Sequence, residues 1–346
     1  MGIQRIVVCE AQVPFVRGGA EYLVRTLAGA LRERGYETEV VSVPFKWYPR
    51  GELLAHAAAW RLLDLSESCG RSIDLAIATK FPTYFVRHPR KVTWLTHQYR
   101  EAYELCGTPY SEFAHTEADV GVRETLIRLD GETLGECRRV FTISRTTAAR
   151  LEHFNGLSRA PLYPPSPFTG RLESGPYGDY VLSVGRLERV KRPDLAVRAM
   201  RHVDQPLRLV VAGSGTVQEE TEALAESLGV SDRVDFLGTV AESELLRLYK
   251  EALAVVYTPY DEDYGYVTLE AFLARKPVVT VADSGGPLEF VEDGVNGFVC
   301  APEPEAIAAA LNRLGGDRGL APRLGHAGFD RVQAVTWDAV IDALIA

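Results

Sequence analysis

Short apolar runs alternate with longer amphipathic stretches along the first half of the chain. The run Ile6–Cys9 is followed by Leu23, Leu27 and Leu31, which recur at helical spacing. This strand–helix order is typical of a parallel sheet covered by helices. Strands are predicted at Ile6–Cys9, Val40–Val43, Asp74–Ala78, Lys91–Leu95 and Val140–Ile143, and helices from Leu23 to near Arg34 and at Leu53–Leu65, Val120–Glu136 and Arg145–His153.

The same alternation resumes in the second half of the chain, which predicts a second sheet of the same kind. Strands are predicted at Tyr180–Val184, Leu207–Ala212, Val234–Leu237, Ala254–Tyr257 and Pro277–Val281, followed by short segments at Pro287–Val291 and Gly297–Val299. Helices are predicted at Asp194–Met200, Gln218–Leu228, Glu242–Ala252 and Val267–Arg275, and within Pro304–Leu314 and Pro322–Val332.

Prolines and glycines crowd residues 156–180 and interrupt the alternation, which is typical of a domain boundary. We therefore expect an N-terminal Rossmann-like domain over residues 1–172 and a C-terminal one over residues 173–332. In open α/β sheets ligands bind at the carboxyl ends of the strands, so a cleft that faces both sets of strand ends is the expected site.

Composition narrows the class of protein. The chain has 346 residues, 46% of them hydrophobic, without a run of about 18 apolar residues that would span a membrane. Residues 1–13 lack the basic region and long apolar run of a signal peptide. The five cysteines are scattered, which favours neither a disulfide framework nor a zinc site, so a reduced cytoplasm is expected and no metal.

Charge is distributed unevenly between the two halves. Residues 1–172 carry 22 Lys/Arg against 19 Asp/Glu, whereas residues 173–346 carry 16 against 28. An acidic protein of this kind is a poor non-specific binder of nucleic acid. The mildly basic first half is either ordinary solvated surface or a surface that meets an anionic acceptor or, peripherally, the inner face of a membrane.

The stretch Glu262–Glu270 carries the clearest candidate chemistry. Glu262 lies in a loop, Glu270 lies within an apolar helical run, and Gly265 between them allows backbone N–H groups to turn toward a ligand. The start of the helix adds unpaired donors and the positive end of a dipole. The combination suits a ligand with hydroxyls and phosphates, such as a sugar nucleotide, although either glutamate alone is typical of a protein surface.

Two cations follow the first strand of the second half. Arg186 leaves the strand end and Lys191 precedes a helix, so a guanidinium fork and an ammonium could hold a diphosphate. The alternative is a solvated basic turn, which is the interpretation we favour for Arg189 and Arg192.

Glycine pairs and one histidine follow other strands. Gly18-Gly19 opens a helix and either binds phosphate or forms a plain turn, and Gly285-Gly286 either allows a ligand to approach or forms a turn. Gly213-Ser214-Gly215 lacks the third glycine of a dinucleotide fingerprint, so a dehydrogenase is weakly supported. His97 follows a strand end, where a functional and a structural role are both open.

These motifs and several others share a characteristic order and spacing. They are Gly18–Glu21, Gly185-Arg186 with Lys191, Val211–Gly215, Val234–Gly238, the E-x7-E element Glu262–Glu270, Pro277–Val279, Gly285–Glu289 and Asp293–Gly297. Together they resemble the retaining glycosyltransferases of the GT-B fold, in the group that includes bacterial mannosyl- and glucosyltransferases, sucrose synthases and glycogen synthases. The resemblance covers nearly the whole chain and implies two Rossmann-like domains facing a cleft.

The resemblance implies roles for individual residues at the diphosphate and the sugar. Arg186 and Lys191 would hold the donor diphosphate with help from the backbone amide of Gly19, and Glu262 would bind sugar hydroxyls. His97 would reach the donor sugar from the first domain, so His97, Arg186, Lys191 and Glu262 are the expected catalytic residues.

The nucleoside end of the donor is assigned in the same way. Glu270 would bind the ribose hydroxyls, and the loop around Phe236 and Leu237 would meet the base. The backbone of Tyr264, Gly265, Tyr266 and Val267 would complete the donor site. In this family the last helix often crosses back to the first domain. Residues 333–346 are expected to form such a helix.

One departure from the family pattern concerns the end of the Glu270 helix. Arg275 stands where the family commonly has glycine, so a different helix end is expected.

The function implied is transfer of a hexosyl group from a nucleoside-diphosphate sugar to a hydroxyl of a glycan, a glycolipid or a small molecule, with retention of configuration and without a metal or other cofactor. Cell-surface glycan or glycolipid biosynthesis is the expected setting. Two alternatives remain: a GT-B nucleotide-sugar epimerase or hydrolase, and a non-catalytic sugar-nucleotide binding protein.

Overall fold

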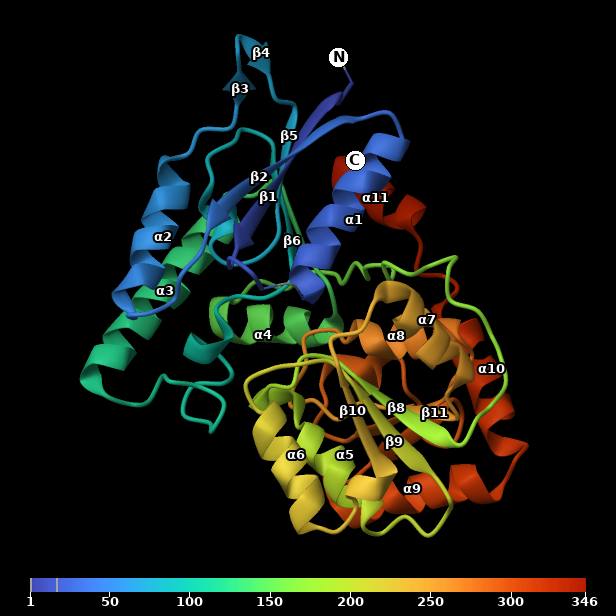
Figure 1. Ribbon diagram of the computed structural model, residues 1–346. Coiled ribbons are helices and arrows are strands. Elements are labelled where there is room, and N and C mark those ends of the chain that lie inside the picture. The colour runs from blue at the N-terminus through green and yellow to red at the C-terminus, as the bar shows by residue number, and fades with distance from the viewer. Residues whose placement is uncertain (1, 17) are drawn as a thin grey trace. The chain divides into compact units, whose positions relative to one another are not determined.

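The computed structural model describes residues 2–16 and 18–346, so Met1 and Arg17 lie outside the described residues. The chain forms two compact units, one of residues up to Pro167 together with Val335–Ala346, the other of Phe168–Ala334. The division at Pro167 lies inside the Pro- and Gly-rich window, a few residues before the predicted boundary. Each unit is a parallel sheet with helices on both faces, so the prediction of two Rossmann-like domains is confirmed (Figure 1).

The first unit contains a five-stranded sheet in the order β2-β1-β5-β6-β7. Its strands are β1 (Arg5–Gln12), β2 (Glu37–Pro44), β5 (Leu75–Ala78), β6 (Lys91–Leu95) and β7 (Arg139–Thr142), and a separate hairpin joins β3 (Glu67–Ser68) to β4 (Arg71–Ser72). Its helices are α1 (Gly19–Glu33), α2 (Gly51–Leu62), α3 (Glu117–Gly135), α4 (Arg145–Asn155) and α11 (Trp337–Ile345), with 3-10 turns η1 (Thr83–Phe85) and η2 (Arg100–Ala102).

The C-terminal helix α11 packs within the first unit, beside α1 (Figure 1). The ring of Trp337 meets the buried ring of Trp94 edge-on, with 6.1 Å between centroids. Arg139 also donates a hydrogen bond to the carbonyl of Ala343 at 3.1 Å. Aromatic burial and carbonyl capping together fix this helix on the sheet of the first unit.

The second unit contains a six-stranded parallel sheet in the order β10-β9-β8-β11-β12-β13. Its strands are β8 (Tyr180–Val184), β9 (Arg208–Ala212), β10 (Val234–Gly238), β11 (Ala254–Val256), β12 (Val278–Val281) and β13 (Gly297–Cys300). Its helices are α5 (Pro193–Met200), α6 (Gln218–Ser227), α7 (Glu242–Glu251), α8 (Tyr266–Leu273), α9 (Pro304–Gly316) and α10 (Leu320–Val332), with 3-10 turns η3 (Arg189–Lys191), η4 (Ser231–Arg233) and η5 (Gly286–Glu289).

Most predicted strands and helices are present, within a few residues of the expected ends. Helix α3 begins one turn earlier than predicted because Thr116 caps it by accepting a hydrogen bond from the N–H of Asp119 at 3.3 Å. The segment Pro287–Val291 forms no strand: the 3-10 turn η5 covers most of it, and the N–H of Val291 donates to the carbonyl of Pro287 at 3.0 Å.

The end of helix α8 corrects the expectation at Arg275. Arg275 adopts the left-handed conformation itself, with φ of 55°, and Lys276 N–H donates to the carbonyl of Ala271 at 2.8 Å. This is the helix end that a glycine would form, at a cost of about 1–2 kcal/mol for a residue with a Cβ. The Arg275 guanidinium lies 4.3 Å from the centroid of the Phe329 ring, a contact that offsets part of this cost.

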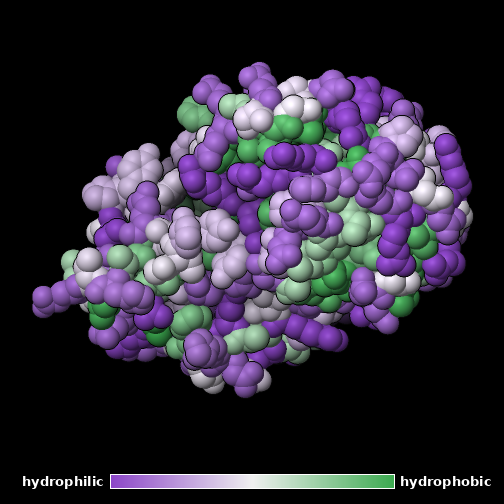
Figure 2. Space-filling model, turned by 90° about the horizontal axis from the view of Figure 1, so that it is seen from below, coloured by the Kyte–Doolittle hydropathy of each residue, from purple (hydrophilic) through white to green (hydrophobic). Residues whose placement is uncertain are grey.

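The surface of the molecule is mostly hydrophilic on the face that Figure 2 presents, with hydrophobic residues in small groups. Within residues 2–16 and 18–346, no helix has the length and hydrophobicity that crossing a bilayer requires.

Helix α10 packs on α8 through a glycine that leaves no room for a side chain. A Cβ on Gly325 would lie 1.9 Å from the carbonyl oxygen of Arg275. Gly325→Ala is therefore expected to lower the free energy of unfolding by about 1–3 kcal/mol, since the helix must shift. Gly316→Ala is the control, because the nearest atom to its Cβ is 3.8 Å away. Urea denaturation measures both, and equal stability of the two variants would contradict this packing.

Candidate active site

The strand order of the second unit brings two candidate loops together. Strands β9 and β10 lie on one side of β8, whereas β11 lies on the other, so the order reverses between β8 and β11. In open α/β sheets this reversal leaves a crevice beyond the carboxyl ends of the two strands. Arg186 and Lys191 follow β8, and the loop with Glu262 and Gly265 follows β11. The motifs separated by about 75 residues in sequence therefore meet at one edge.

Lys191 and Glu262 form an ion pair across this crevice, in which Lys191 Nζ donates to Glu262 Oε2. Their side chains are 21% and 12% exposed, which limits screening by water. The Arg186 side chain is exposed and forms neither a hydrogen bond nor an ion pair with any residue that the structure describes. One cation is thus held beside a carboxylate and the other faces solvent.

Arg192 corrects the prediction of a solvated basic turn. It is buried, with φ of 49°, and donates to the backbone carbonyls of Thr258 and Pro259 at 2.9 and 2.8 Å. It also forms a bidentate ion pair with Asp283 at 2.5 and 2.8 Å. The guanidinium therefore joins the loops after β8, β11 and β12. Arg189 is exposed as predicted and pairs only with Glu220 among the described residues.

The glycine pair Gly285-Gly286 supports the Glu262 loop. A Cβ on Gly285, where φ is 71°, would lie 2.6 Å from the carbonyl oxygen of Glu262, and one on Gly286 would lie 2.6 Å from the Cα of Tyr264. The N–H of Gly286 donates to the carbonyl of Glu262 at 2.7 Å, and the N–H of Glu262 donates to the carbonyl of Ser284 at 2.8 Å. The space beside these glycines is filled by the backbone of this loop.

The turn into helix α8 depends on Gly265 and on a buried tyrosine. Gly265 has φ of 84° and packs against the ring of Tyr257. A Cβ on Gly265 would lie 2.9 Å from the Cε1 atom of that ring. Burial and the negative charge of Glu262 hold the pKa of Tyr257 well above its ordinary value. Tyr264 is buried and meets the rings of Tyr266 and Phe290 edge-on.

Glu270 lies on α8 and is only 6% exposed. Its Oε2 accepts a hydrogen bond of 2.7 Å from the hydroxyl of Tyr249 on α7. Val267, on the same helix, is buried. Each glutamate of the E-x7-E element has a polar partner from another part of the chain: Lys191 pairs with Glu262, and Tyr249 donates to Glu270.

The Gly213–Gly215 turn is explained by packing. A Cβ on Gly213 would lie 1.9 Å from the carbonyl oxygen of Gly185, and one on Gly215 would lie 2.3 Å from that of Leu187. These glycines therefore allow the loop after β9 to lie against the loop that carries Arg186. At the end of β10, Phe236 is partly buried and Leu237 is 41% exposed at a register irregularity.

In the first unit the strand order reverses between β1 and β5, beside the N-terminus of α1. Gly19 is exposed in the first turn of α1, where backbone N–H groups lack partners within the helix. Glu21 accepts hydrogen bonds from the N–H of Gly18 and from Lys80 Nζ, both at 2.8 Å. Burial raises the pKa of Glu21, but Lys80 and Gly18 outweigh it and hold this pKa below its ordinary value.

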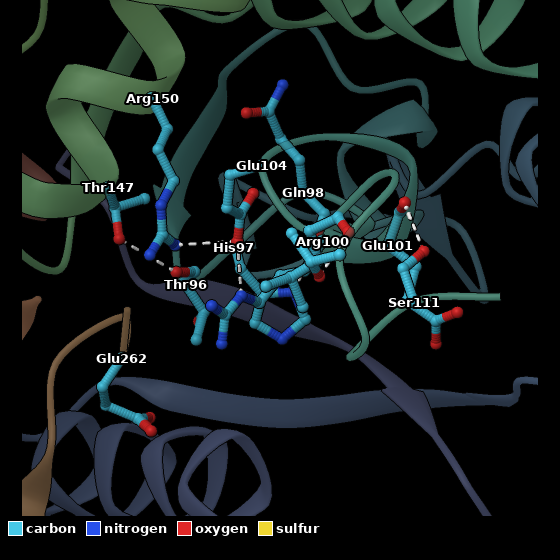
Figure 3. Close-up of polar contacts among 12 residues, drawn as sticks. Thr96, His97, Gln98, Arg100, Glu101, Glu104, Ser111, Thr147, Arg150 and Glu262 are labelled. Atoms are coloured by element: carbon cyan, nitrogen blue, oxygen red, sulfur yellow. Dashed lines mark hydrogen bonds and ion pairs between the residues drawn. The ribbon is translucent and has the colours of Figure 1, made fainter. Parts of the chain in front are cut away.

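His97 lies in the loop after β6, beside a cluster of charged residues (Figure 3). Its Nδ1 is 2.6 Å from the carbonyl oxygen of Gln98. A carbonyl oxygen only accepts, so Nδ1 carries the hydrogen in this contact. Next to it, Glu104 bridges Arg100 at 2.5 Å and Arg150 at 3.2 Å.

A polar network joins the His97 loop to helices α3 and α4. The Gln98 side chain donates to Asn155 at 2.6 Å, and Asn155 donates to the carbonyl of Ile127 on α3 at 2.9 Å. On the same helix, fully buried Asp130 accepts a hydrogen bond of 2.5 Å from the hydroxyl of Tyr103. Burial raises the pKa of Asp130 to about 7, although the bond from Tyr103 acts in the opposite direction.

Sequence patterns missed several residues that shape these sites. Arg192, Tyr249, Tyr257 and Asp130 are buried polar groups whose partners are distant in sequence. A tyrosine within an apolar run looks like any other core residue, so the sequence does not show that its hydroxyl has a polar partner. A charged residue inside a predicted helix, such as Asp130, does not by itself indicate from the sequence whether it is buried.

Curated relatives match this chain over different lengths. A model of the family described as Glycosyl transferases group 1 matches residues 173–331. A D-inositol 3-phosphate glycosyltransferase of Actinosynnema mirum is 31% identical over 293 residues, which cover 74% of this chain and 69% of that protein. An uncharacterized glycosyltransferase of Methanocaldococcus jannaschii is 37% identical over 164 residues. The matched region covers 46% of this chain and 42% of that protein.

Two solved structures share the fold over nearly the whole chain. The sucrose-phosphate synthase of Thermosynechococcus elongatus has a TM-score of 0.76 at 20% identity, with 98% of each chain covered. HepE of Anabaena, solved in complex with UDP and glucose, has a TM-score of 0.70 at 18% identity, with 98% and 97% covered. Both are GT-B glycosyltransferases, so the predicted GT-B fold is confirmed.

Arg192 and Arg189 offer a matched pair of substitutions. Arg192→Met leaves Asp283 and two carbonyls without their donor, so it should lower the free energy of unfolding by about 2–4 kcal/mol. Arg189→Met removes only an exposed pair and should change it by about 0.5 kcal/mol or less. Urea denaturation distinguishes the two variants. A similar loss of unfolding free energy in both would show that the contacts of Arg192 with three loops do not stabilise the fold.

Asp130 gives a pH dependence of stability whose sign can be stated. Its pKa is raised from 3.8 to about 7 on folding, so the folded state binds the proton more tightly. Stability should therefore fall as pH rises between these two values, by a few kcal/mol at most, and level off above.

Asp130→Asn should remove that part of the slope, which urea denaturation at pH 5 and pH 8 would measure. Glu132→Gln, on the exposed face of the same helix, is the control and should leave the slope unchanged. A slope that survives in Asp130→Asn would locate the titrating group elsewhere.

Proposed function

The chain belongs to the group 1 glycosyltransferases, and we propose that it transfers a hexosyl group from a nucleoside-diphosphate sugar to an acceptor hydroxyl with retention of configuration. The observation that carries the proposal is the meeting of Arg186, Lys191, Glu262 and Gly265 at the strand-order reversal between β8 and β11. Cations and a helix start suit a diphosphate, and carboxylates suit the hydroxyls of the sugar and the ribose.

In this proposal Arg186 binds the diphosphate as a fork, and Lys191 adds a point charge. Glu262 and the backbone around Gly265 hold sugar hydroxyls, and Glu270 holds the ribose. Phe236 and Leu237 meet the base. The roles of His97 and of the Gly19 amide stay predictions from the family resemblance. The assignments are those that the family resemblance implies, and the positions of Arg186, Lys191 and Glu262 after the carboxyl ends of β8 and β11 support them.

We propose a same-face reaction. The bond between the anomeric carbon and the diphosphate oxygen breaks, the acceptor oxygen bonds to that carbon, and the leaving diphosphate takes the acceptor's proton. Catalysis then depends on stabilising the charge of the leaving group and on orienting the acceptor. The exposed Arg186 side chain, which has no partner among the described residues, is available for that charge.

The acceptor is proposed as a glycan, a glycolipid or a small molecule, in biosynthesis of a cell-surface glycan or glycolipid on the cytoplasmic side. Support comes from relatives: the protein of Actinosynnema mirum carries the name of an enzyme that glycosylates an inositol phosphate. The mildly basic first half is compatible with such an anionic acceptor. Peripheral contact with a membrane is part of the proposal for a glycolipid acceptor only.

Turnover tests the proposal directly. The protein is incubated with UDP- and GDP-linked glucose, galactose, mannose and N-acetylglucosamine, with and without inositol phosphate or oligosaccharide acceptors, and products are detected by mass spectrometry. Transfer with retained configuration is the expected result. Release of free sugar alone would favour a hydrolase, isomerised nucleotide sugar an epimerase, and stabilisation by nucleotide without turnover a binding protein.

Arg186→Met should lower kcat/KM about 10²–10³-fold, as loss of a charge-stabilising donor does at other sites. Arg189→Met, an exposed arginine of the same turn, should leave kcat/KM within about twofold, since its pair with Glu220 is exposed. Steady-state kinetics with the preferred donor measures both. Equal activity of the two variants would remove Arg186 from the diphosphate site.

A further inference from the structure

The charge of Glu270 acts on three tyrosines of the second unit, one of which hydrogen-bonds it. The negative charge of Glu270 acts together with burial to raise the pKa of Tyr249, of Tyr257 and of Tyr266. Tyr266 is one helical turn before Glu270 on α8, and its buried hydroxyl has no hydrogen-bond partner among the described residues. Glu270 is therefore a buried acid on which tyrosine hydroxyls act from α7 and α8.

Of these tyrosines, Tyr249 holds the carboxylate directly. Its hydroxyl donates to Glu270 Oε2 at 2.7 Å, and its side chain is fully buried on α7. Because the pKa of Tyr249 is well above its ordinary value, the hydroxyl stays protonated and remains a donor. The bond links two helices, so the position of Glu270 depends on α7 as well as on α8.

The plane of a glutamate carboxylate is set weakly by its own chain, because the last torsion angle has a broad energy profile. A fixed donor on one oxygen removes that freedom and defines the direction of the other oxygen. Two neighbouring ribose hydroxyls need both oxygens in a defined plane, so a turned carboxylate loses part of the contact.

We propose that Tyr249 is a positioning residue that orients Glu270 toward the ribose, and that this pair gives the site its preference for ribonucleotides over nucleotides without ribose hydroxyls. The proposal rests on the proposed function, in which Glu270 binds the ribose. Tyr249 itself touches no ligand and acts through the carboxylate.

The chain offers a matched control. Tyr180 donates its hydroxyl to the carbonyl of Leu248, the residue before Tyr249, at 2.8 Å. Tyr180→Phe therefore removes a tyrosine hydrogen bond to the same turn of α7 without touching Glu270. Tyr249→Phe removes one hydroxyl and keeps the ring, so both variants keep the packing of the helix.

The experiment measures the dissociation constants of UDP and of 2′,3′-dideoxy-UDP by calorimetry, with the two GDP analogues as a second pair. Wild-type protein should bind UDP, or GDP, about tenfold or more tightly than the dideoxy analogue, the loss typical of hydrogen bonds to a charged group. Tyr249→Phe should weaken the ribonucleotide about tenfold and leave the dideoxynucleotide unchanged, which a general loss of structure would not do. Tyr180→Phe should keep the wild-type preference.

Glu270→Gln supplies a second test of whether Tyr249 acts through the Glu270 carboxylate. In that background Tyr249→Phe should have no further effect on the preference, because the carboxylate through which it acts is gone. Equal weakening of both nucleotides by Tyr249→Phe, or no weakening, would overturn the proposal. If wild-type protein itself binds both nucleotides equally, or neither, the assignment of Glu270 to ribose falls, and the proposal with it.

Discussion

Close contact between backbone segments is the constraint on which the candidate active site depends. The loop after β12 touches the loop after β11 through Gly285 and Gly286, and the loop after β9 touches the loop after β8 through Gly213. A side chain at these glycines would occupy space that neighbouring carbonyl groups already fill. Arg192 then joins three of these loops with one guanidinium. Glu262 is therefore positioned by a framework of backbone and one buried cation.

The sequence predicts the framework of strands and helices well because apolar periodicity records burial on the two faces of each sheet. It also predicts which strand ends several candidate residues follow, and carboxyl ends of parallel strands share one edge. It fails where a role depends on a distant partner: Arg192 has the same local pattern as Arg189, yet one is buried and the other exposed. Left-handed Arg275 shows that a backbone conformation can be kept without glycine.

The two glutamates of the motif illustrate two ways to keep an acid in a partly buried place. Glu262 has the charge of Lys191 beside it, so its environment is close to neutral overall. Glu270 accepts a hydrogen bond from a tyrosine hydroxyl, which offsets part of the cost of desolvation. Spacing in sequence cannot separate these cases, because the lysine and the tyrosine come from η3 and α7.

The pair of Lys191 with Glu262 has a consequence for the small anions of the cell. An ammonium left alone in a crevice would capture inorganic phosphate, which is abundant and would compete with a larger substrate. With Glu262 against it, Lys191 is already neutralised, and a simple anion gains little by displacing that carboxylate. A ligand that also offers hydroxyl donors to the released carboxylate recovers the loss. Under the proposed function, the closed pair would therefore favour a phosphate that carries a sugar over a bare phosphate.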